Sequence, residues 1–436
     1  MLDDNFFLES NVRTYSRAFP AIFDRAEGAW LTDNSGQRHL DFLAGCGSLN
    51  YGHNHPELKQ TLARYIERDG ICMSMDLQSV ARQQFLTRFK ELILDPRGLD
   101  HLVQFPGPTG ANAVEAAIKL ARKVTGRSNV ISFTNGFHGC SLGALALTGS
   151  QHHRASSSGQ LNQVTRMPYE GYMGDGLDTA EYLEQVLNDP SSGVDAPAAI
   201  ILETVQGEGG LQTASKAWMQ RVTQIAHDCG ALLIVDDIQA GCGRTGSFFS
   251  FEPLGIVPDI ICMAKAISGY GLPMALVLLR PELDVWSPGE HNGTFRGNNF
   301  AFVCATAALE TFWADPTFTR QLQSLCARMD QETQALATQY GLQRKGRGAM
   351  LGLQFSDLDQ AKAVQQACVQ QGLIIELCGP RGEVLKFLPP LTLTDAEWDR
   401  GIMIVASALN EHASPQDKGQ APVQKQTRVL TSVSDT

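Results

Sequence analysis

The feature that most constrains how this chain folds is a regular alternation of short apolar runs with helix-forming stretches from about residue 101 onward. The runs are mostly apolar on both faces, as strands buried between two layers of helices must be. They are His101–Phe105, Val130–Phe133, Ala199–Leu202, Ala231–Val235, Ile260–Met263 and Met274–Leu279. Between the first two runs, Ala111–Val124 repeats its apolar residues at helical spacing. This alternation predicts an α/β fold on a mostly parallel sheet, with functional residues at the carboxyl ends of the strands.

The regions on either side of this alternation have different patterns. A short hairpin is expected where Gly28–Leu31 and Leu40–Leu43 flank a turn-forming Asp-Asn-Ser-Gly run. A long helical stretch at Ala301–Tyr340 precedes a smaller α+β region with strand candidates at Met350–Phe355 and Leu373–Leu377. We therefore expect an N-terminal segment (1–48) that packs with a small domain, a large domain (49–300), the small domain itself (301–412) and a disordered tail (413–436).

Composition excludes several classes of function. The formal net charge is -11, which argues against binding to nucleic acid or to an anionic membrane surface. The start of the chain lacks the pattern of a secretory signal, and no apolar run is long enough to span a membrane. The 10 cysteines form no Cys-x-x-Cys pair, so we expect reduced thiols in a cytoplasmic protein. His53 and His55 lack the ligand spacing of a metal site, and no metal is expected.

A glycine-rich stretch at 241–246 matches the G-x-G-x-x-G pattern of dinucleotide-binding proteins. Such a site requires the turn to open a helix, because the pyrophosphate is bound by free N–H groups at the helix N-terminus. Here the sequence continues with Ser-Phe-Phe-Ser-Phe-Glu-Pro and soon reaches Gly255 and Pro258, which does not predict a helix. The G-x-x-x-x-G-K-S/T pattern of nucleotide-phosphate loops is absent as well. Nicotinamide and nucleotide-triphosphate chemistry are therefore disfavoured.

Charged residues follow two neighbouring apolar runs at the points where each strand should end. Asp236 and Asp237 follow Ala231–Val235, either as turn caps or as partners of a buried cation. Lys265 follows Ile260–Met263 and is embedded in apolar residues. Burial lowers the pKa of a lysine because desolvation disfavours the ammonium form, and the neutral amine is a nucleophile. A lysine and a carboxylate placed in this way suit a cofactor that needs a Schiff base and a partner for a pyridinium nitrogen.

A phosphate site is also expected. The turn Gln104-Phe105-Pro106-Gly107-Pro108-Thr109-Gly110 leads directly into the helix predicted to begin near Ala111. The free N–H groups and positive dipole at a helix N-terminus bind phosphate. By itself such a turn is usually only a helix cap. Together with Lys265 and Asp236 it indicates a site for a phosphorylated aldehyde cofactor.

The motifs at these positions resemble those of the class III (omega) aminotransferases of pyridoxal phosphate (PLP) fold type I, over nearly the whole chain up to His412. The matching segments are Val235–Gly246, Pro258-Asp259 with Lys265, Gly136-Phe137-His138-Gly139, Glu203–Gly210 and Gly293–Asn298. The resemblance implies a large domain with a mostly parallel seven-stranded sheet, a smaller α+β domain, and PLP as the cofactor.

The resemblance also implies a role for each matching residue. Lys265 would bind PLP as a Schiff base and move the proton, while Asp236 would keep the pyridinium nitrogen protonated. The other expected cofactor contacts are Phe137 stacked on the ring, His138 positioning the ring, Gln239 at the phenolic oxygen, Gly110 and Ala111 at the phosphate, and Thr294 reaching the phosphate of the neighbouring subunit. Thr294 thus implies a homodimer, or a dimer of dimers, with composite active sites.

The sequence departs from the family pattern in two places, one on the substrate side and one in the phosphate turn. Glu208 is the expected substrate-side acid, but Lys386 precedes Phe-Leu-Pro-Pro-Leu where many relatives have an arginine that binds a carboxylate. A lysine offers a point charge in place of a bidentate fork, and Arg296 and Arg381 are alternative candidates for that role. The phosphate turn has Ala111-Asn112 where many relatives have serine and glutamate, with Thr109 available to replace the lost hydroxyl.

Several stretches resemble, within that family, the diaminobutyrate–2-oxoglutarate aminotransferases of the ectoine-synthesis type. They are Val12–Arg17, Asp41–Gly45, Leu49–His53, Val103–Gly110 and Ser132–Gly139. The implied reaction exchanges an amino group between L-2,4-diaminobutyrate and 2-oxoglutarate, giving L-aspartate 4-semialdehyde and glutamate. The alternatives are another omega-aminotransferase acting on ornithine, 4-aminobutyrate or a polyamine, a PLP aminomutase, and a silent relative that serves as an interaction module.

Overall fold

The centre of the molecule is a seven-stranded sheet, seen in a computed structural model that describes residues 8–155, 159, 161–174 and 176–412. The expected tail at 413–436 lies outside these residues. The strands, in spatial order, are β4 (Leu102–Gln104), β12 (Leu276–Leu279), β11 (Ile260–Met263), β10 (Leu232–Asp236), β7 (Ala199–Leu202), β5 (Val130–Phe133) and β6 (Val164–Met167). β12 runs antiparallel to both of its neighbours, and the other pairings are parallel. The predicted mostly parallel α/β sheet is therefore confirmed.

All six apolar runs form strands of this sheet, because both faces of the sheet are covered by helices. In β10, Leu233 and Val235 belong to one hydrophobic core and Ile234 belongs to the other. Helix α5 (Gly110–Thr125) packs on the second face, while α9 (Lys216–Asp228) packs on the first. The edge strand β6 was not predicted. Its sequence Val-Thr-Arg-Met is only partly buried and lacks an apolar run.

The remaining helices surround this sheet or belong to the C-terminal region. They are α1 (Tyr15–Ala18), α2 (Ala44–Gly47), α3 (Pro56–Glu67), α4 (Val80–Phe89), α6 (Leu142–Leu147), α7 (Gln151–Arg154), α8 (Thr179–Asn188), α10 (Asn299–Phe312), α11 (Pro316–Tyr340), α12 (Leu358–Gln370) and α13 (Asp395–His412). The single long helical stretch expected at Ala301–Tyr340 is wrong, since α10 and α11 are separate helices. The side chain of Asp315 caps α11 by accepting from the backbone N–H of Thr317, and Pro316 occupies its first turn.

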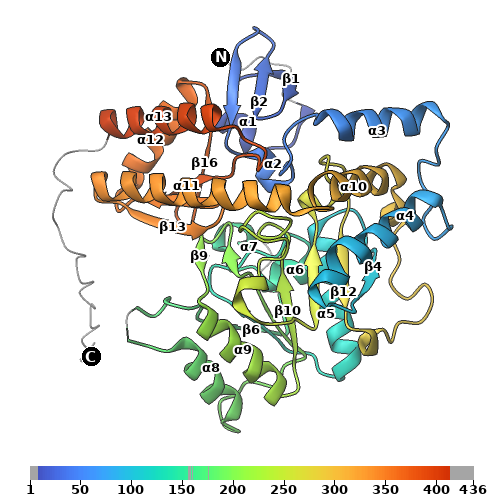
Figure 1. The fold of residues 1–436 in the computed structure, drawn as a ribbon. Coiled ribbons are helices and arrows are strands. Elements are labelled where there is room, and N and C mark those ends of the chain that lie inside the picture. Colours follow the sequence, from blue (N-terminus) through green and yellow to red (C-terminus); the bar gives the residue numbers. More distant parts are fainter. Residues whose placement is uncertain (1–7, 156–158, 160, 175, 413–436) are drawn as a thin grey trace, which may run out of the picture.

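Two small sheets bring the N-terminal strands against the C-terminal region (Figure 1). One sheet contains β1 (Phe23–Glu27), β2 (Trp30–Asp33), β3 (Arg38–Asp41) and β15 (Leu373–Ile374), and the other contains β13 (Gln343–Arg347), β14 (Met350–Gln354), β17 (Val384–Phe387) and β16 (Glu376–Cys378). A short hairpin of β8 (Val205–Gln206) and β9 (Gln212–Thr213) packs against the second of these sheets. The expected hairpin is confirmed as β2–β3. The single strand expected at Leu373–Leu377 is wrong, because the chain breaks at Ile375 and its two halves join different sheets.

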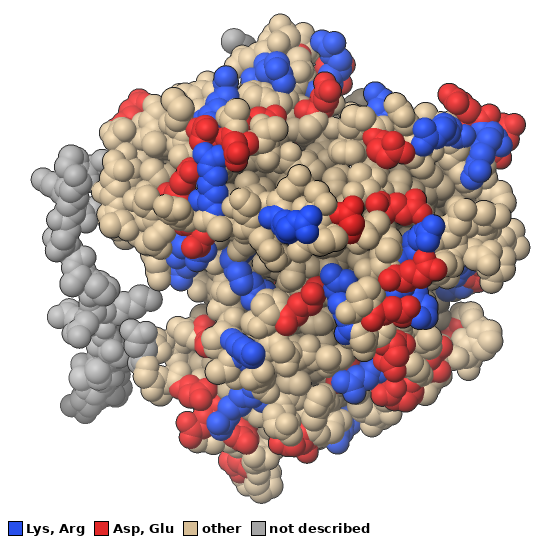
Figure 2. Space-filling view, in the orientation of Figure 1, with Lys and Arg blue, Asp and Glu red and all other residues tan. Residues whose placement is uncertain are grey.

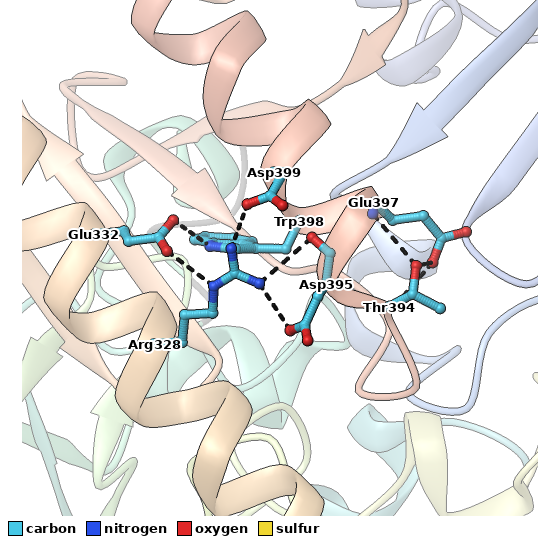
Figure 3. Close-up of polar contacts among 7 residues, drawn as sticks. All are labelled: Arg328, Glu332, Thr394, Asp395, Glu397, Trp398 and Asp399. Atoms are coloured by element: carbon cyan, nitrogen blue, oxygen red, sulfur yellow. Dashed lines mark hydrogen bonds and ion pairs between the residues drawn. The ribbon is translucent and has the colours of Figure 1, made fainter.

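Helix α13 is fixed to α11 by one arginine and three carboxylates (Figure 3). Arg328 of α11 contacts Glu332 at 2.9 Å and Asp395 at 2.7 Å, and it also pairs with Asp399. The other carboxylate oxygen of Glu332 accepts from the indole N–H of Trp398 at 2.8 Å. Trp398 is fully buried and stacks on Phe42. The polar network therefore orients the aromatic anchor that joins α13 to the N-terminal segment.

The surface carries charges of both signs, and Figure 2 shows lysines and arginines interspersed with aspartates and glutamates on the face drawn there. Within residues 8–412, apart from the few undescribed positions, no helix is long and apolar enough to cross a membrane. In the same residues no group of three or more histidine, cysteine or acidic side chains is arranged to hold a metal ion. All 10 cysteines are free.

Candidate active site

A cavity of about 400 Å³ lies at the carboxyl ends of β10 and β11, against the N-terminus of α5. Its lining contains seven of the residues expected to bind the cofactor and the expected substrate-side acid, which are Gly110, Ala111, Phe137, His138, Asp236, Gln239, Lys265 and Glu208. These residues are separated by up to 155 positions in the sequence, and the strand order of the sheet brings them together. The rest of the wall includes Ser48, Ile238, Glu203 and the 271–274 segment.

Lys265 is the first residue of a short 3-10 turn that follows β11. Its φ of 53° lies in the left-handed region, which a non-glycine residue adopts at a cost of about 1 kcal/mol or more. The turn directs the side chain into the cavity. Burial lowers the pKa of the Lys265 ammonium and the nearby Lys386 lowers it further, while Glu208 partly opposes both. The neutral amine is therefore more accessible here than in an exposed lysine.

Asp236 ends β10, and a buried histidine holds it in place. His138 Nδ1 lies 2.7 Å from one carboxylate oxygen of Asp236, and the backbone N–H of Ile238 donates to the other at 3.2 Å. Burial alone would lower the pKa of His138, but the hydrogen bond and charge of Asp236 outweigh it and raise the pKa. The neighbouring Asp237 is a structural residue, because its carboxylate accepts from the backbone N–H of Ser250. Only Asp236 lines the cavity.

The N-terminus of α5 opens onto the same cavity. Thr109 caps the helix: its hydroxyl donates to Asn112 Oδ1 at 2.9 Å and accepts from the Asn112 N–H at 3.4 Å. The Asn112 oxygen also accepts from the Thr109 N–H at 3.2 Å, which completes a capping box. A Cβ at Gly110 would come within 2.9 Å of the end of the Ile238 side chain, so glycine lets the helix N-terminus and Ile238 pack closely. The free N–H groups of the first turn, Gly110 and Ala111 included, form an anion site.

Glu203 shapes the wall that carries Phe137. Its two carboxylate oxygens accept from the backbone N–H groups of Phe137 at 2.9 Å and Gly207 at 3.2 Å. Burial raises the pKa of Glu203 to about 7, although nearby His138 opposes this effect. The half-buried ring of Phe137 faces the cavity and contacts His153 edge-on with the ring centres 5.3 Å apart.

The side-chain amide of Gln239 forms hydrogen bonds through its nitrogen but not through its oxygen. Its Nε2 donates to the carbonyl of Cys46 at 3.1 Å and to Glu208 at 3.3 Å. Its Oε1 is buried and has no hydrogen-bond partner within the described part of the chain. Such orphaned buried groups are rare in proteins, and one that lines a cavity indicates a ligand atom opposite it.

Glu208 is held by Lys386, which does not itself line the cavity. Lys386 Nζ lies 2.9 Å from Glu208 and 2.8 Å from Glu376, and its side chain has no exposed surface. Burial raises the pKa of Glu208, but Lys386 and Lys265 outweigh burial and lower it to about 2. The pKa of Lys386 is raised well above its usual value, because the two carboxylates outweigh desolvation.

Three further residues that the sequence offered for the phosphate or carboxylate sites do not line the cavity of their own chain. Thr294 belongs to an exposed turn, Thr294–Gly297. Arg296 pairs with Asp76, and Arg381 is exposed. Among the described residues that line the cavity, Lys265 is the only lysine or arginine.

Two polar residues beside the site were missed in the sequence. Glu376 pairs with Lys386, and the hydroxyl of Tyr15 donates to Glu376 at 3.1 Å. Glu376 could have been found, since a lone acid within the apolar Leu373–Leu377 run signals a buried charge that needs a partner. Tyr15 gave no comparable signal, because only the tertiary structure brings the N-terminal segment to β16.

The glycine-rich stretch at 241–246 forms consecutive turns and no helix, as predicted. It places Arg244, which is fully buried, so that its guanidinium donates to the carbonyls of Ala349 and Pro389 and to Asn50 Oδ1. The stretch therefore joins the seven-stranded sheet to the C-terminal region, and it lacks the helix N-terminus that a dinucleotide site requires.

The donor set fits pyridoxal phosphate. A lysine amine, a carboxylate for the pyridinium nitrogen and a helix N-terminus for the phosphate surround one cavity, which Gln239 also lines. Each group that the cofactor requires is present on a rigid element or immediately after one.

Comparison with known proteins agrees with this geometry. Residues 12–409 match the family of class III aminotransferases. A diaminobutyrate–2-oxoglutarate transaminase of Vibrio cholerae is 56% identical over 92% of this chain and 98% of its own length. The corresponding transaminase of Vibrio parahaemolyticus is 53% identical over 94% and 98%. The solved ornithine aminotransferase of Toxoplasma gondii, with PLP at partial occupancy in its active site, superposes with a TM-score of 0.79 at 25% identity over 95% of this chain and 94% of that one.

Proposed function

The chain belongs to the class III aminotransferases, and on that basis we propose that it transfers the terminal amino group of L-2,4-diaminobutyrate to 2-oxoglutarate. The products are L-aspartate 4-semialdehyde and glutamate. The observation that carries this proposal is the likeness to two transaminases of that name, more than half identical over nearly the full length of both chains. The expected PLP fold type I and the expected cofactor agree with the family.

Pyridoxal phosphate, when bound, supplies an aldehyde carbon and an electron-withdrawing ring that stabilises negative charge on the donor carbon. Lys265 Nζ would hold the cofactor through its aldehyde group. Asp236, held by His138, would keep the ring nitrogen protonated through a charge-assisted hydrogen bond. Phe137 would cover the ring, Gln239 would lie near the phenolic oxygen, and the first turn of α5 would bind the phosphate.

Lys265 would also move the proton. It is the only lysine or arginine lining the cavity among the described residues, and burial lowers its pKa, which favours the neutral amine that can accept a proton. Its side chain would carry that proton away from the donor carbon. In the second half of the reaction 2-oxoglutarate would accept the amino group and leave as glutamate.

We further propose that the enzyme is a dimer, with Thr294 completing the phosphate site of the partner. The turn that carries Thr294 lies beside the 71–80 segment, since Ser74 N–H donates to the carbonyl of Gly297. Three large apolar side chains are exposed here, with exposed fractions of 72% for Leu77, 64% for Val80 and 63% for Phe295. Such an apolar patch is typical of an interface. Light scattering after gel filtration should give twice the chain mass, and Phe295→Asp should give the monomer; a monomeric wild type would refute the proposal.

The free cysteines support a cytoplasmic location, because a reducing compartment keeps thiols unpaired. Fractionation of the producing cell should place the enzyme with soluble cytoplasmic markers, and recovery outside that fraction would contradict this assignment.

The test of the reaction is glutamate formation from L-2,4-diaminobutyrate and 2-oxoglutarate with added PLP. Ornithine and 4-aminobutyrate are run in parallel as competing donors, and Lys265→Ala is the blank. Turnover confined to diaminobutyrate, and lost in the variant, is the expected result. Faster turnover of ornithine or 4-aminobutyrate would refute the assignment of the donor, and turnover of diaminobutyrate without an oxo acid would indicate an aminomutase.

A further inference from the structure

The cluster formed by Glu208, Lys386 and Glu376 is not electrically balanced. One ammonium faces two carboxylates at 2.9 and 2.8 Å, so the cluster carries a formal charge of −1. The exposed fractions of the side chains are 0% for Lys386, 8% for Glu376 and 35% for Glu208. The excess negative charge can therefore contact a ligand only through Glu208, which lines the cavity.

Neighbouring groups do not cancel this charge. Tyr15 contacts Glu376 and the thiol of Cys46, but burial raises the pKa of each, to about 11 for Cys46, and both remain neutral at physiological pH. Asp236 is paired with His138 on another wall of the cavity. Lys265 is engaged with the cofactor. The end of the cavity near Glu208 is therefore an anionic site.

We propose that Glu208 binds the distal ammonium of the amino donor, and that Glu376 is the positioning residue that makes this possible. Glu376 shares the charge of Lys386, so that Glu208 keeps an uncompensated negative charge toward the cavity. The inference rests on the proposed function, because L-2,4-diaminobutyrate carries an α-ammonium at the end remote from the reacting amine. 4-Aminobutyrate has the same chain length and lacks that group, and the cluster therefore discriminates between the two donors.

The same charge acts in the opposite direction on the second substrate. The distal end of 2-oxoglutarate is a carboxylate, which an anionic wall repels. A substitution that neutralises the cluster should therefore weaken binding of the donor and strengthen binding of the acceptor. A merely structural defect would weaken both.

The test compares the wild type with Glu376→Gln, which preserves size and removes the excess charge. We expect KM for diaminobutyrate to rise about tenfold and KM for 2-oxoglutarate to fall several-fold, with kcat changed less than about twofold, as the loss of one nearby charge implies. Glu208→Gln, a second variant that removes the same charge, should show the same opposite shifts. Glu184→Gln is the matched control, because it makes the same chemical change in an exposed ion pair with Arg221 outside the cavity and should leave both KM values near those of the wild type.

A binding measurement separates recognition from turnover. In a Lys265→Ala background loaded with PLP, diaminobutyrate is titrated against the absorbance of the cofactor, with and without Glu376→Gln. A dissociation constant about tenfold weaker in the double variant supports the proposal. The proposal about Glu208 and Glu376 is overturned if both KM values shift in the same direction, or if the dissociation constant is unchanged. In that case turnover of diaminobutyrate by the wild type still supports the proposed function. A wild type that prefers 4-aminobutyrate overturns both.

Discussion

Replacing Lys386 by methionine should destabilise the protein in a strongly pH-dependent way. The substitution preserves volume, but it leaves two carboxylates without their shared cation in a buried site. Both contact the same nitrogen within 2.9 Å, so their oxygens lie within about 6 Å of each other; at an effective dielectric constant near 20 their repulsion is about 3 kcal/mol. Measured losses for breaking a buried ion pair are of similar size, about 3–5 kcal/mol.

The sign of the pH dependence follows from the two states of Glu208. In the wild type its pKa is about 2, below the value near 4.5 for the unfolded chain. Its stabilising contribution is therefore present above about pH 4.5 and is lost as the pH falls toward 2. In Lys386→Met the pKa of at least one carboxylate rises above 4.5, because an adjacent like charge and burial both favour the neutral form. The loss of stability in Lys386→Met is therefore largest at high pH, and it becomes smaller as the pH falls through the raised pKa.

The assay is thermal unfolding of the PLP-free protein at about pH 8 and about pH 5.5. Lys386→Met should lower Tm by about 3–6 °C at the higher pH and by clearly less at the lower. The double variant Lys386→Met with Glu376→Gln removes the repulsion and should recover most of the loss at the higher pH. An equal loss at both pH values, or no recovery in the double variant, would show that the cavity left by lysine, and not the charge, causes the defect.

Three further predictions concern other parts of the molecule. Arg328→Ala should lower the free energy of unfolding by about 1–2 kcal/mol, because it frees three partly exposed carboxylates; the difference should shrink in high salt, and a salt-independent difference would contradict this account. Thr109→Val should cost about 1 kcal/mol through loss of the α5 cap, as measured by thermal unfolding against the near-neutral control Thr109→Ser. Asp236→Asn should lower kcat at least about a hundredfold while the protein stays folded; wild-type turnover would exclude its role at the ring nitrogen.

The sequence predicted the central sheet well because burial on both faces leaves a simple pattern. A strand such as β11, covered by helices on each side, must be apolar at every position, and it can be read without knowledge of its neighbours. The same reasoning failed at β6, an edge strand that is only partly covered. It also failed at Leu373–Leu377, where one apolar run serves two sheets, because nothing local encodes which partner each half will pair with.

The residues of the candidate site also differ in how far the local sequence predicts them. Lys265 and Asp236 were predictable because each directly follows a buried strand, and parallel strands bring their carboxyl ends to one edge of the sheet. The polar partners on the substrate side were not predictable from local sequence, since Glu376 meets Lys386 only through the pairing of β16 with β17, and Tyr15 reaches Glu376 from the N-terminal segment.

The exchange of arginine for lysine at position 386 becomes intelligible only with Glu376 beside it. An arginine would bind a single carboxylate through a bidentate fork and leave that pair neutral, whereas an ammonium is a point charge that two carboxylates can share at nearly equal distance. A lysine fully enclosed by protein also needs both partners to remain charged, because desolvation would otherwise favour its neutral form. The exchange itself leaves the net charge unchanged, because arginine and lysine each carry one positive charge. The negative charge of this wall comes from Glu376, and the point charge of Lys386 lets both carboxylates share it, so that Glu208 presents the polarity that a donor with a second ammonium requires.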